Sequence, residues 1–591
     1  MPEILIDFSR QQVDVQWDSK EIQRDLKNAT VQLSHHCLKL AAKWACEQLI
    51  GLPEEEEEEP MVSVPSDMHT MTSKELYAKS LLELGDYAHA AAILSQPAVH
   101  VTVIAPALPK LSNYGIFLRA YSMYLAGEQR KSRQQLELKD PLTSQEISKN
   151  PFLQQLRNEL GDVFEKQQLD AFGLYVYGMV LKESLPTKGR HNAYDVLVES
   201  IRMFPCNWSA WLDLADLEQD SDQLHQEFGP HYMYHFYSAH VLLQKKQAHE
   251  ASIQIYQKLA QPTTHDNMTL FAGSPYVASQ MAVAHYHLRE FHLSEHCFAQ
   301  IHQRDPYRLE EMDIYSNILY VADNGMALSQ LAHTAMRVDK YRPETCCIVG
   351  NYYSLKNLRT KAILYFQRAL KLNPKYTGAW TLMGHEYVEL KNTPAAMEAY
   401  RKAADISPRD YRAWYGLGQA YEILSMPLYA LYYYRKACTV RPYDARMWSA
   451  VAGCYLSLGK RKEAILSYEK ALADDVEGMA TAQLANLYQQ DGDTTKAAQC
   501  FQKHLELRYL ATTAHPSGDP SLGEILQSVV VQAPEARALL FLANHFLSGG
   551  NDETAALCAS RLLEYPGPEK EEGKAVLREI RSRRGGGGPI L

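Results

Sequence analysis

Apolar and small residues recur through the middle of the chain with a fixed period of 34 residues. One copy of the series reads Trp380, Met383, Gly384, Tyr387, Ala396, Tyr400, Ala403 and Pro408. The next copy reads Trp414, Leu417, Gly418, Tyr421, Ala430, Tyr434, Ala437 and Pro442. The first four positions follow steps of three, one and three residues, which place them on one face of an α-helix. The series therefore predicts a pair of amphipathic helices, the second of which ends at proline because proline cannot continue the hydrogen-bond ladder.

The period and the residue types match the tetratricopeptide repeat (TPR), a helix–turn–helix unit. Small residues such as Gly384 and Ala396 let two antiparallel helices approach closely, and the large residues fill the remaining space. A single pair leaves an apolar face uncovered, so neighbouring pairs must stack to bury it. We therefore predict an all-α fold, a superhelical TPR solenoid of about 12–14 helix pairs.

The register is regular in the centre of the chain and weakens towards both ends. Within the regular part, Val476 stands where a proline is expected, and the following copy is shifted by one residue. From these differences we expect an N-terminal helical segment at 1–52, an acidic linker at 53–70, an irregular TPR array at 71–260, an insertion loop at 261–274, the regular TPR array at 275–508, a loop and helix at 509–535, a C-terminal TPR with a capping helix at 536–580 and a flexible tail at 581–591.

Composition narrows the classes of partner. The net charge of −10 argues against nucleic acid as the main partner. The 10 cysteines have no paired spacing, which is typical of a reducing compartment. No apolar run reaches the length of a membrane span, and the first residues lack the apolar core of a signal peptide. We expect a soluble intracellular protein.

The residues that resemble catalytic or metal-binding motifs do not complete any motif. His292 and His296 have a spacing that can chelate a cation, but they lack further ligands at metal-site spacing. Gly416 and Gly418 begin like a dinucleotide fingerprint, but Tyr421 occupies the place of its third glycine. No phosphate-binding loop, serine-hydrolase or kinase signature is present. We therefore expect no catalytic residue, no cofactor and no metal site.

The strongest candidate site is the concave groove that the first helix of each TPR pair lines. Its side chains should lie two residues before, and one and five residues after, the tryptophan position. In this chain those places, with one residue a turn further on, hold Glu310, Asp313, Asn317, Glu344, Asn351, His385, Tyr415, Gln419 and Glu422. Amides can hold the backbone of an extended peptide, and carboxylates suit an arginine. Because solvated helix faces carry the same residue types, we predict the set as a peptide groove rather than any single contact.

Three segments in the regular array carry a more specific resemblance. They are KYTGAWTLMGHEYVELKN (375–392), DYRAWYGLGQAYEIL (410–424) and LYALYYYRKA (428–437). The amino-acid sequences of these segments resemble the cell division cycle protein 23 family, which comprises TPR scaffold subunits of the anaphase-promoting complex/cyclosome. That complex is a multi-subunit cullin-RING ubiquitin ligase that controls mitotic progression. The likeness is most specific over residues 340–475 and extends over essentially the full length.

The resemblance implies a noncatalytic subunit, since ubiquitin transfer belongs to the cullin and RING subunits. It further implies a homodimer formed through the N-terminal repeats, stacking with sister TPR subunits, and small accessory subunits along the array. The inner groove would receive a short arginine-containing segment of an activator (coactivator) subunit. We expect a location in the nucleus and cytoplasm, with no nucleic-acid or membrane partner.

Two other functions stay open. One is a TPR adaptor or co-chaperone that clamps acidic peptide tails, which would need lysine and arginine along the groove. The predicted groove positions instead carry Glu, Asp, Asn and Gln, which disfavours the clamp. The other is an enzyme whose site is invisible in sequence, and a stacked-helix array gives no reason to expect one.

Overall fold

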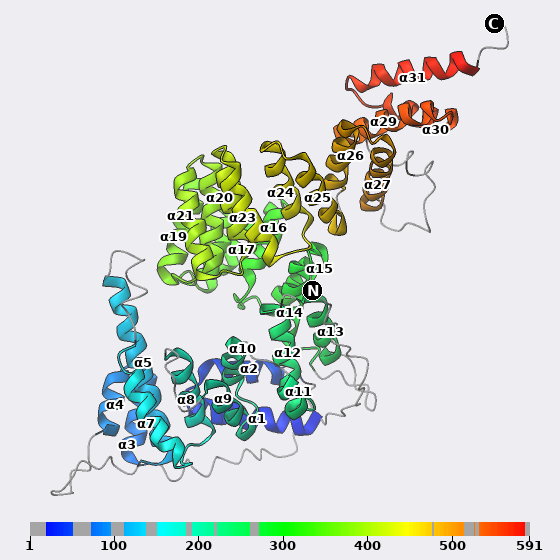
Figure 1. Ribbon diagram of the computed structural model, residues 1–591. Coiled ribbons are helices and arrows are strands. Elements are labelled where there is room, and N and C mark those ends of the chain that lie inside the picture. The colour runs from blue at the N-terminus through cyan, green and yellow to red at the C-terminus, as the bar shows by residue number, and fades with distance from the viewer. Residues whose placement is uncertain are drawn as a thin grey trace, which may run out of the picture. The chain divides into compact units, whose positions relative to one another are not determined.

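The computed structural model describes residues 19–50, 52, 72–95, 111–137, 150–184, 192–217, 222–246, 248–260, 271–475, 478–512, 525 and 531–584. Over these residues the regular elements are helices, and consecutive helices pack as antiparallel pairs (Figure 1). This arrangement confirms the predicted all-α TPR fold. Within the same residues, no helix combines the length and apolarity needed to cross a bilayer.

The chain forms two compact units, Met1–Ile318 and Leu319–Leu591. The helices of the first unit are α1 (Ser19–His35), α2 (Lys39–Ile50), α3 (Ser73–Leu84), α4 (Tyr87–Ser95), α5 (Asn113–Glu137), α7 (Leu153–Glu165), α8 (Ala171–Glu183), α9 (Ala193–Met203), α10 (Trp208–Asp216), α11 (Asp222–Phe228), α12 (Tyr232–Gln244), α13 (His249–Ala260), α14 (Pro275–His287) and α15 (Phe291–Arg304). Helix α16 (Met312–Val321) begins in this unit and ends in the next.

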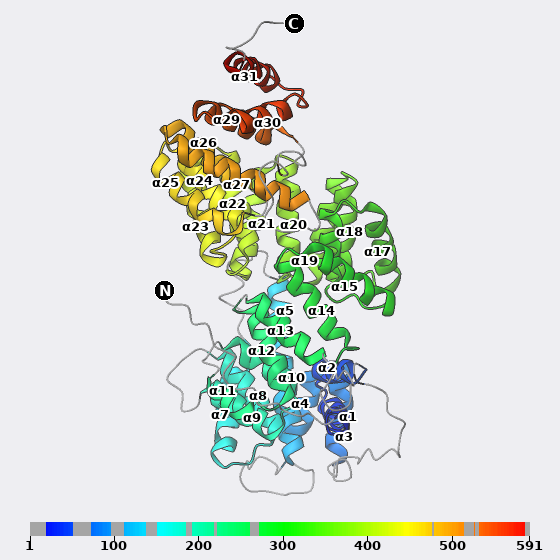
Figure 2. The same cartoon turned by 90° about the vertical axis from the view of Figure 1, so that its right-hand side faces the viewer.

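The second unit contains the regular repeats and the C-terminal helices (Figure 2). Its helices are α17 (Gly325–Val338), α18 (Pro343–Leu355), α19 (Arg359–Leu372), α20 (Thr377–Glu389), α21 (Thr393–Ile406), α22 (Tyr411–Ile423), α23 (Pro427–Val440), α24 (Ala445–Ser457), α25 (Arg461–Ala471), α26 (Met479–Asp491), α27 (Thr494–Thr512), α29 (Ala533–Ser548), α30 (Asp552–Leu562) and α31 (Glu569–Arg584), with a short 3-10 turn at Leu472–Asp474.

The 34-residue period also appears in the backbone of the turn inside each pair. One residue per turn adopts the left-handed region, at Arg289 (φ 67°), Asp323 (53°), Asn357 (57°), Lys391 (60°), Ser425 (57°) and Gly459 (73°). The next residue donates its N–H to the carbonyl five positions earlier, as Asn392 does to Tyr387 at 2.9 Å. This bond satisfies a carbonyl that the helix end leaves without a partner. The repeat therefore specifies turn geometry even where the residue is not glycine.

Packing within a pair explains why glycine and a large aromatic residue recur together. The Tyr400 ring, on the second helix of its pair, is fully buried between Gly384 and Gly416. A Cβ atom added to Gly384 would lie 2.5 Å from the Tyr400 ring, and one added to Gly416 would lie 2.6 Å away. Only glycine lets helices α20 and α22 approach the ring this closely.

A hydrogen bond joins the recurring tryptophan of each copy to the backbone carbonyl of the proline that ends the preceding copy. The indole Nε1 of Trp380 donates to the carbonyl of Pro374 at 3.0 Å. Trp414 donates in the same way to Pro408 at 2.8 Å, and Trp448 to the preceding proline at 2.6 Å. In the irregular part of the chain, Trp211 repeats this bond to Pro205 at 2.7 Å. The bond therefore marks repeats that the sequence series shows only weakly.

The N-terminal hairpin of α1 and α2 packs inside the first unit, against α10 and α14. The Trp44 ring stacks on Trp208 with centroids 4.7 Å apart and meets Phe236 edge-on. The buried Gln48 carbonyl accepts a hydrogen bond from Ser274 at 2.8 Å. The N-terminal segment is thus built into the core of this unit.

Several predicted segments fall wholly or partly outside the described residues. The acidic linker at 53–70 does so, as do Val476 and most of the insertion loop at 261–274. At the C-terminus, α31 continues to Arg584, so the first residues of the predicted tail at 581–591 are helical. The helix continues there because Arg583 donates to the Leu547 carbonyl at 2.9 Å and pairs with Glu579.

Candidate peptide-binding site

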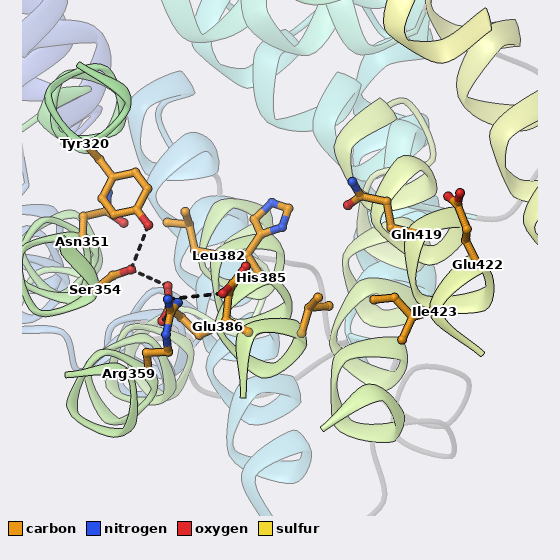
Figure 3. A pocket seen from close by; sticks show the side chains of 12 residues that line it. Tyr320, Asn351, Ser354, Arg359, Leu382, His385, Glu386, Gln419, Glu422 and Ile423 are labelled. Carbon is orange, nitrogen blue, oxygen red and sulfur yellow. Dashed lines mark hydrogen bonds and ion pairs between the residues drawn. The ribbon is translucent and has the colours of Figure 1, made fainter. Parts of the chain in front are cut away.

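A pocket of ≈ 590 Å³ opens along the first helices of three consecutive pairs in the second unit (Figure 3). Helices α18, α20 and α22 supply most of its walls, and α16 and α19 add one residue each. It is lined by Tyr320, Asn351, Ser354, Arg359, Leu382, His385, Glu386, Val388, Glu389, Gln419, Glu422 and Ile423. The stacking of successive TPR pairs therefore brings together side chains from positions 320 to 423.

Glu386 is the centre of a hydrogen-bond and ion-pair chain on one wall of the pocket. Ser354 donates to Glu386 Oε1 at 2.5 Å, and its oxygen lies 3.3 Å from the Tyr320 hydroxyl. The Arg359 guanidinium lies 3.6 Å from Glu386 Oε2 and 3.2 Å from a Glu389 oxygen. Figure 3 shows this chain running from Tyr320 through Ser354 and Glu386 to Arg359. The wall is polar and held by partners from three helices.

The Glu386 carboxylate is buried and incompletely satisfied. Glu386 is only 5% exposed. Burial raises the pKa of its carboxyl group, although Ser354 and Arg359 favour the ionised form. Among the described residues, Glu386 Oε2 makes no hydrogen bond, but it forms an ion pair with the Arg359 guanidinium at 3.6 Å. Because this ion pair is longer than a hydrogen bond, the oxygen keeps the capacity to accept a further donor. The pocket therefore presents an acceptor that favours a cationic donor.

The opposite side of the pocket is anchored by tyrosines from the second helices. The Tyr400 hydroxyl lies 2.8 Å from His385 Nδ1, and the Tyr434 hydroxyl donates to Glu422 Oε2 at 2.7 Å. Both tyrosine rings are buried, whereas His385 and Glu422 are exposed. Core side chains thus hold two groove side chains in place. Figure 3 shows Gln419 and Glu422 on α22, across the pocket from Ser354.

The charge of the pocket is negative. Glu386, Glu389 and Glu422 supply three carboxylates, and Arg359 is the one lysine or arginine among the lining residues. Leu382, Val388 and Ile423 add apolar surface. This combination suits a basic group carried on a short, partly apolar peptide.

Four of the predicted groove residues line this pocket together, namely Asn351, His385, Gln419 and Glu422. The other two in the second unit do not line it. Glu344 lies 3.5 Å from the Arg342 guanidinium, and the half-buried Tyr415 ring packs 5.3 Å from that of Tyr434.

The remaining three predicted residues belong to the first unit. Glu310 forms an ion pair with Lys43 of α2, and the Arg308 guanidinium lies 3.7 Å from its second oxygen. The Asp313 carbonyl accepts a hydrogen bond from Ser316 at 2.6 Å, and Asn317 is half-buried. Glu310 is thus already engaged by basic residues of its own chain.

Sequence reasoning missed the residue at the centre of the pocket, Glu386, and its partners Ser354 and Arg359. Three of the missed lining residues had a readable signal. Glu422 lies one turn beyond the fifth place, and the same place in the three earlier repeats holds Tyr320, Ser354 and Val388, all of which line the pocket. Glu386 lies one residue after the predicted His385, on a part of α20 that the three-place rule does not include.

Two of the histidines at 285–296 contact neighbours on their own or the adjoining helix turn. His285 Nδ1 lies 2.6 Å from a Glu290 oxygen, and the His296 ring faces Gln300. No group of three or more potential ligands is present among the described residues.

Family comparisons agree with this architecture. The sequence model of the family "Anaphase promoting complex subunit 8 / Cdc23" matches residues 21–282, and TPR models match 343–376, 384–424, 448–480 and 480–514. The chain is 43% identical to anaphase-promoting complex subunit 8 of Arabidopsis thaliana, over 96% of this chain and 98% of that protein. It is 50% identical to the subunit 8 of Dictyostelium discoideum, over 71% of this chain and 66% of that protein.

Two further proteins are similar to this chain at lower sequence identity. The human cell division cycle protein 23 homolog is 39% identical over 54% of this chain and 50% of its own length. The crystal structure of the APC/C hetero-tetramer Cut9-Hcn1 contains a chain with the same fold, at TM-score 0.53 and 16% identity, over 96% of this chain and 97% of that one. The near-complete match to the Arabidopsis protein determines the assignment: the chain belongs to the anaphase-promoting complex subunit 8/Cdc23 family, whose members are noncatalytic TPR scaffold subunits.

Proposed function

We propose that this protein is a scaffold of the anaphase-promoting complex and that the pocket along α18, α20 and α22 binds an arginine-containing segment of an activator subunit. The observation that carries the proposal is Glu386 Oε2, a buried carboxylate oxygen that forms an ion pair with Arg359 at 3.6 Å but accepts no hydrogen bond within the described residues. A guanidinium is the side chain best suited to it, because its planar donors match carboxylate geometry.

The surroundings of Glu386 support an arginine over a lysine. Glu389 and Glu422 add negative charge at the same pocket, so that a bound guanidinium can meet more than one carboxylate. Arg359 already bridges two carboxylates in this way, since one of its terminal nitrogens pairs with Glu386 and the other with Glu389. Lysine has a single ammonium and cannot bridge two acceptors in this planar way.

The amides of Asn351 and Gln419 supply the groups that an extended peptide backbone needs. They line the pocket from α18 and α22, on either side of α20. A side-chain amide offers both a donor and an acceptor, which complement a backbone carbonyl and N–H. Leu382 and Ile423 provide apolar contacts for the residues that flank the arginine.

A titration of the full chain with fluorescent peptides tests the pocket. A peptide with one arginine should bind, and its citrulline analogue should not, because citrulline lacks the charge. Glu386→Gln keeps the shape and the acceptor for Ser354, and should lower affinity roughly thirtyfold, since removing one partner of a buried charge pair costs about 2 kcal/mol.

Glu398 provides the matched control. Its side chain is 70% exposed on α21 and pairs with Lys402 outside the pocket, so Glu398→Gln should leave peptide affinity unchanged. Equal affinity for the arginine and citrulline peptides would exclude the pocket as an arginine site, even if a variant were misfolded.

The scaffold role extends to homodimerisation through the N-terminal repeats, stacking with sister TPR subunits, contacts with small accessory subunits, and a location in nucleus and cytoplasm. Family membership supports these features. Co-purification with cullin- and RING-containing partners from cell extract tests the assembly, and light scattering of the purified chain tests the dimer. A chain that stays alone in extract would contradict the proposal.

An adaptor or co-chaperone that clamps acidic tails is less consistent with the pocket. Such a clamp needs unpaired lysine or arginine side chains in the groove. Arg359, the cation of this pocket, is already shared by two carboxylates. Peptides that end in acidic residues should therefore bind weakly or not at all.

A further inference from the structure

The second helices of two consecutive pairs carry cations and no carboxylates. The sequences of α17 (GMALSQLAHTAMRV) and α19 (RTKAILYFQRALKL) contain no aspartate or glutamate. Between them they hold Arg337, Arg359, Lys361, Arg368 and Lys371. Four of these cations lie on α19, whereas the other acid-free helices α4, α12, α14, α23 and α24 carry two or fewer lysines and arginines each.

The outward face of α19 mixes these cations with exposed leucines. We define the α19 face as Lys361, Leu364, Arg368, Lys371 and Leu372, whose spacing places them on one side of the helix. Leu364 is 63% exposed and Leu372 is 43% exposed. The opposite side of α19 is buried in the core through Ala362, Ile363, Phe366, Ala369 and Leu370. Both faces of this helix therefore carry apolar residues, and one of them is open.

A tyrosine extends the α19 face towards the preceding pair. Tyr341 is 61% exposed and precedes α18. Lys340 Nζ lies 5.0 Å from the centre of its ring, and the Arg368 guanidinium lies 5.2 Å from it on α19. Cation–π contacts of this kind hold the two positive groups near the ring. Within the described residues, Lys361, Arg368 and Lys371 form no ion pair with a carboxylate.

We propose that the α19 face, together with Tyr341, is a docking surface for a partner segment that carries acidic side chains beside leucine-like residues. Charge complementarity selects the acidic residues, because several unpaired cations gather on an acid-free helix. The exposed leucines select apolar neighbours on the same segment, and burying them would remove them from water. A nucleic acid would satisfy the cations but would leave both leucines without a matching surface.

Helix α25, the equivalent helix three repeats later, provides a comparison for the α19 face. Leu466 on α25 occupies the same register place as Leu364, three repeats later, and is 59% exposed. The places that hold Lys361 and Leu372 on α19 are there taken by Glu463 and Asp474. An acidic segment should therefore distinguish the two helices although the leucines are equally exposed.

The test uses the full chain and a short fluorescein-labelled peptide in which glutamates surround leucines at helical spacing. Fluorescence anisotropy should show saturable binding that weakens with salt. Leu364→Ser combined with Lys371→Glu should lower affinity about tenfold or more, equivalent to 1.4 kcal/mol. Leu466→Ser should leave affinity unchanged. Both sites are exposed, and circular dichroism verifies that the variants stay folded.

Two control ligands distinguish an acidic peptide site from non-specific binding and from a nucleic-acid site. A peptide with lysine in place of every glutamate should not bind, and a single-stranded RNA oligonucleotide should bind more weakly than the acidic peptide. Equal loss of affinity in the α19 and α25 variants would overturn the proposal. So would tighter binding of the RNA, which would make the face a nucleic-acid site.

Discussion

The close packing of Tyr400 between Gly384 and Gly416 gives a direct test of how the repeats are held together. Replacing Gly384 by alanine adds one methyl group to α20, 2.5 Å from a ring atom of Tyr400. Ordinary carbon contacts begin near 3.5 Å, so the ring or the helix must move by about 1 Å. The ring has no free space, because it is fully buried and Gly416 approaches it from the next pair.

Two opposing effects determine the magnitude. Alanine is favoured over glycine inside a helix by about 1 kcal/mol. Overpacking a filled core costs about 1–3 kcal/mol. We therefore expect Gly384→Ala to destabilise this part of the array by up to about 2 kcal/mol. Ala452, which occupies the equivalent place two repeats later, indicates that the variant will still fold.

Gly453 is the matched control, because it lies inside α24 and a Cβ atom added there meets no atom within 4 Å. Gly453→Ala should stabilise its helix by about 1 kcal/mol through helix propensity alone. Repeat arrays do not unfold as one unit, so the measurement is local. Hydrogen exchange followed by mass spectrometry reports the opening free energy of α20–α22 and of α24 separately.

Opposite signs for the two substitutions would support the packing. If Gly384→Ala raised protection of α20 as much as Gly453→Ala raises that of α24, the close approach to Tyr400 would be refuted. A double substitution adds a second check. Gly384→Ala together with Tyr400→Leu should cost less than the sum of the single changes, because leucine leaves room for the new methyl group.

Three further predictions concern other parts of the chain. His36 stacks on Phe172 with ring centroids 3.6 Å apart, and burial lowers the pKa of His36 to about 4. Its contribution to the free energy of unfolding is therefore fully present above about pH 6.5 and is lost as the pH falls towards 4, by up to about 3 kcal/mol. In urea unfolding between pH 7.5 and 5, the free energy of unfolding should depend less on pH for His36→Gln than for the wild type. Lys391 has φ 60°, so Lys391→Gly should raise the opening free energy of the α20–α21 pair by about 0.5–1 kcal/mol in hydrogen exchange, and a lower value would contradict this. The Tyr434 hydroxyl holds Glu422 at 2.7 Å, so Tyr434→Phe should weaken arginine-peptide binding severalfold while the circular dichroism spectrum stays that of the wild type, and unchanged affinity would show that Glu422 needs no anchor.

Much of the fold follows from the repeat, because each element is specified by contacts within about two neighbouring pairs. Trp380 and Tyr400 mark positions whose packing is local, so their spacing is readable in sequence. The site is only partly readable, since Glu386 owes its burial and its partners to Ser354 and Arg359 of the preceding pair. Glu310 shows the limit most clearly: its partner Lys43 lies 267 residues away, in a helix that has no repeat pattern.

The indole bonds between consecutive copies have a consequence for how the array responds to force. From Pro374 to Trp448 each joint between pairs carries a tryptophan N–H bonded to a carbonyl of the preceding copy. At the joint before α18 the same place holds Cys346, whose sulfur lies 4.0 Å from the Lys340 carbonyl and is a weak donor. When the TPR array is pulled from its ends, the joint at Cys346 should therefore separate at a lower force than the joints that carry a tryptophan hydrogen bond.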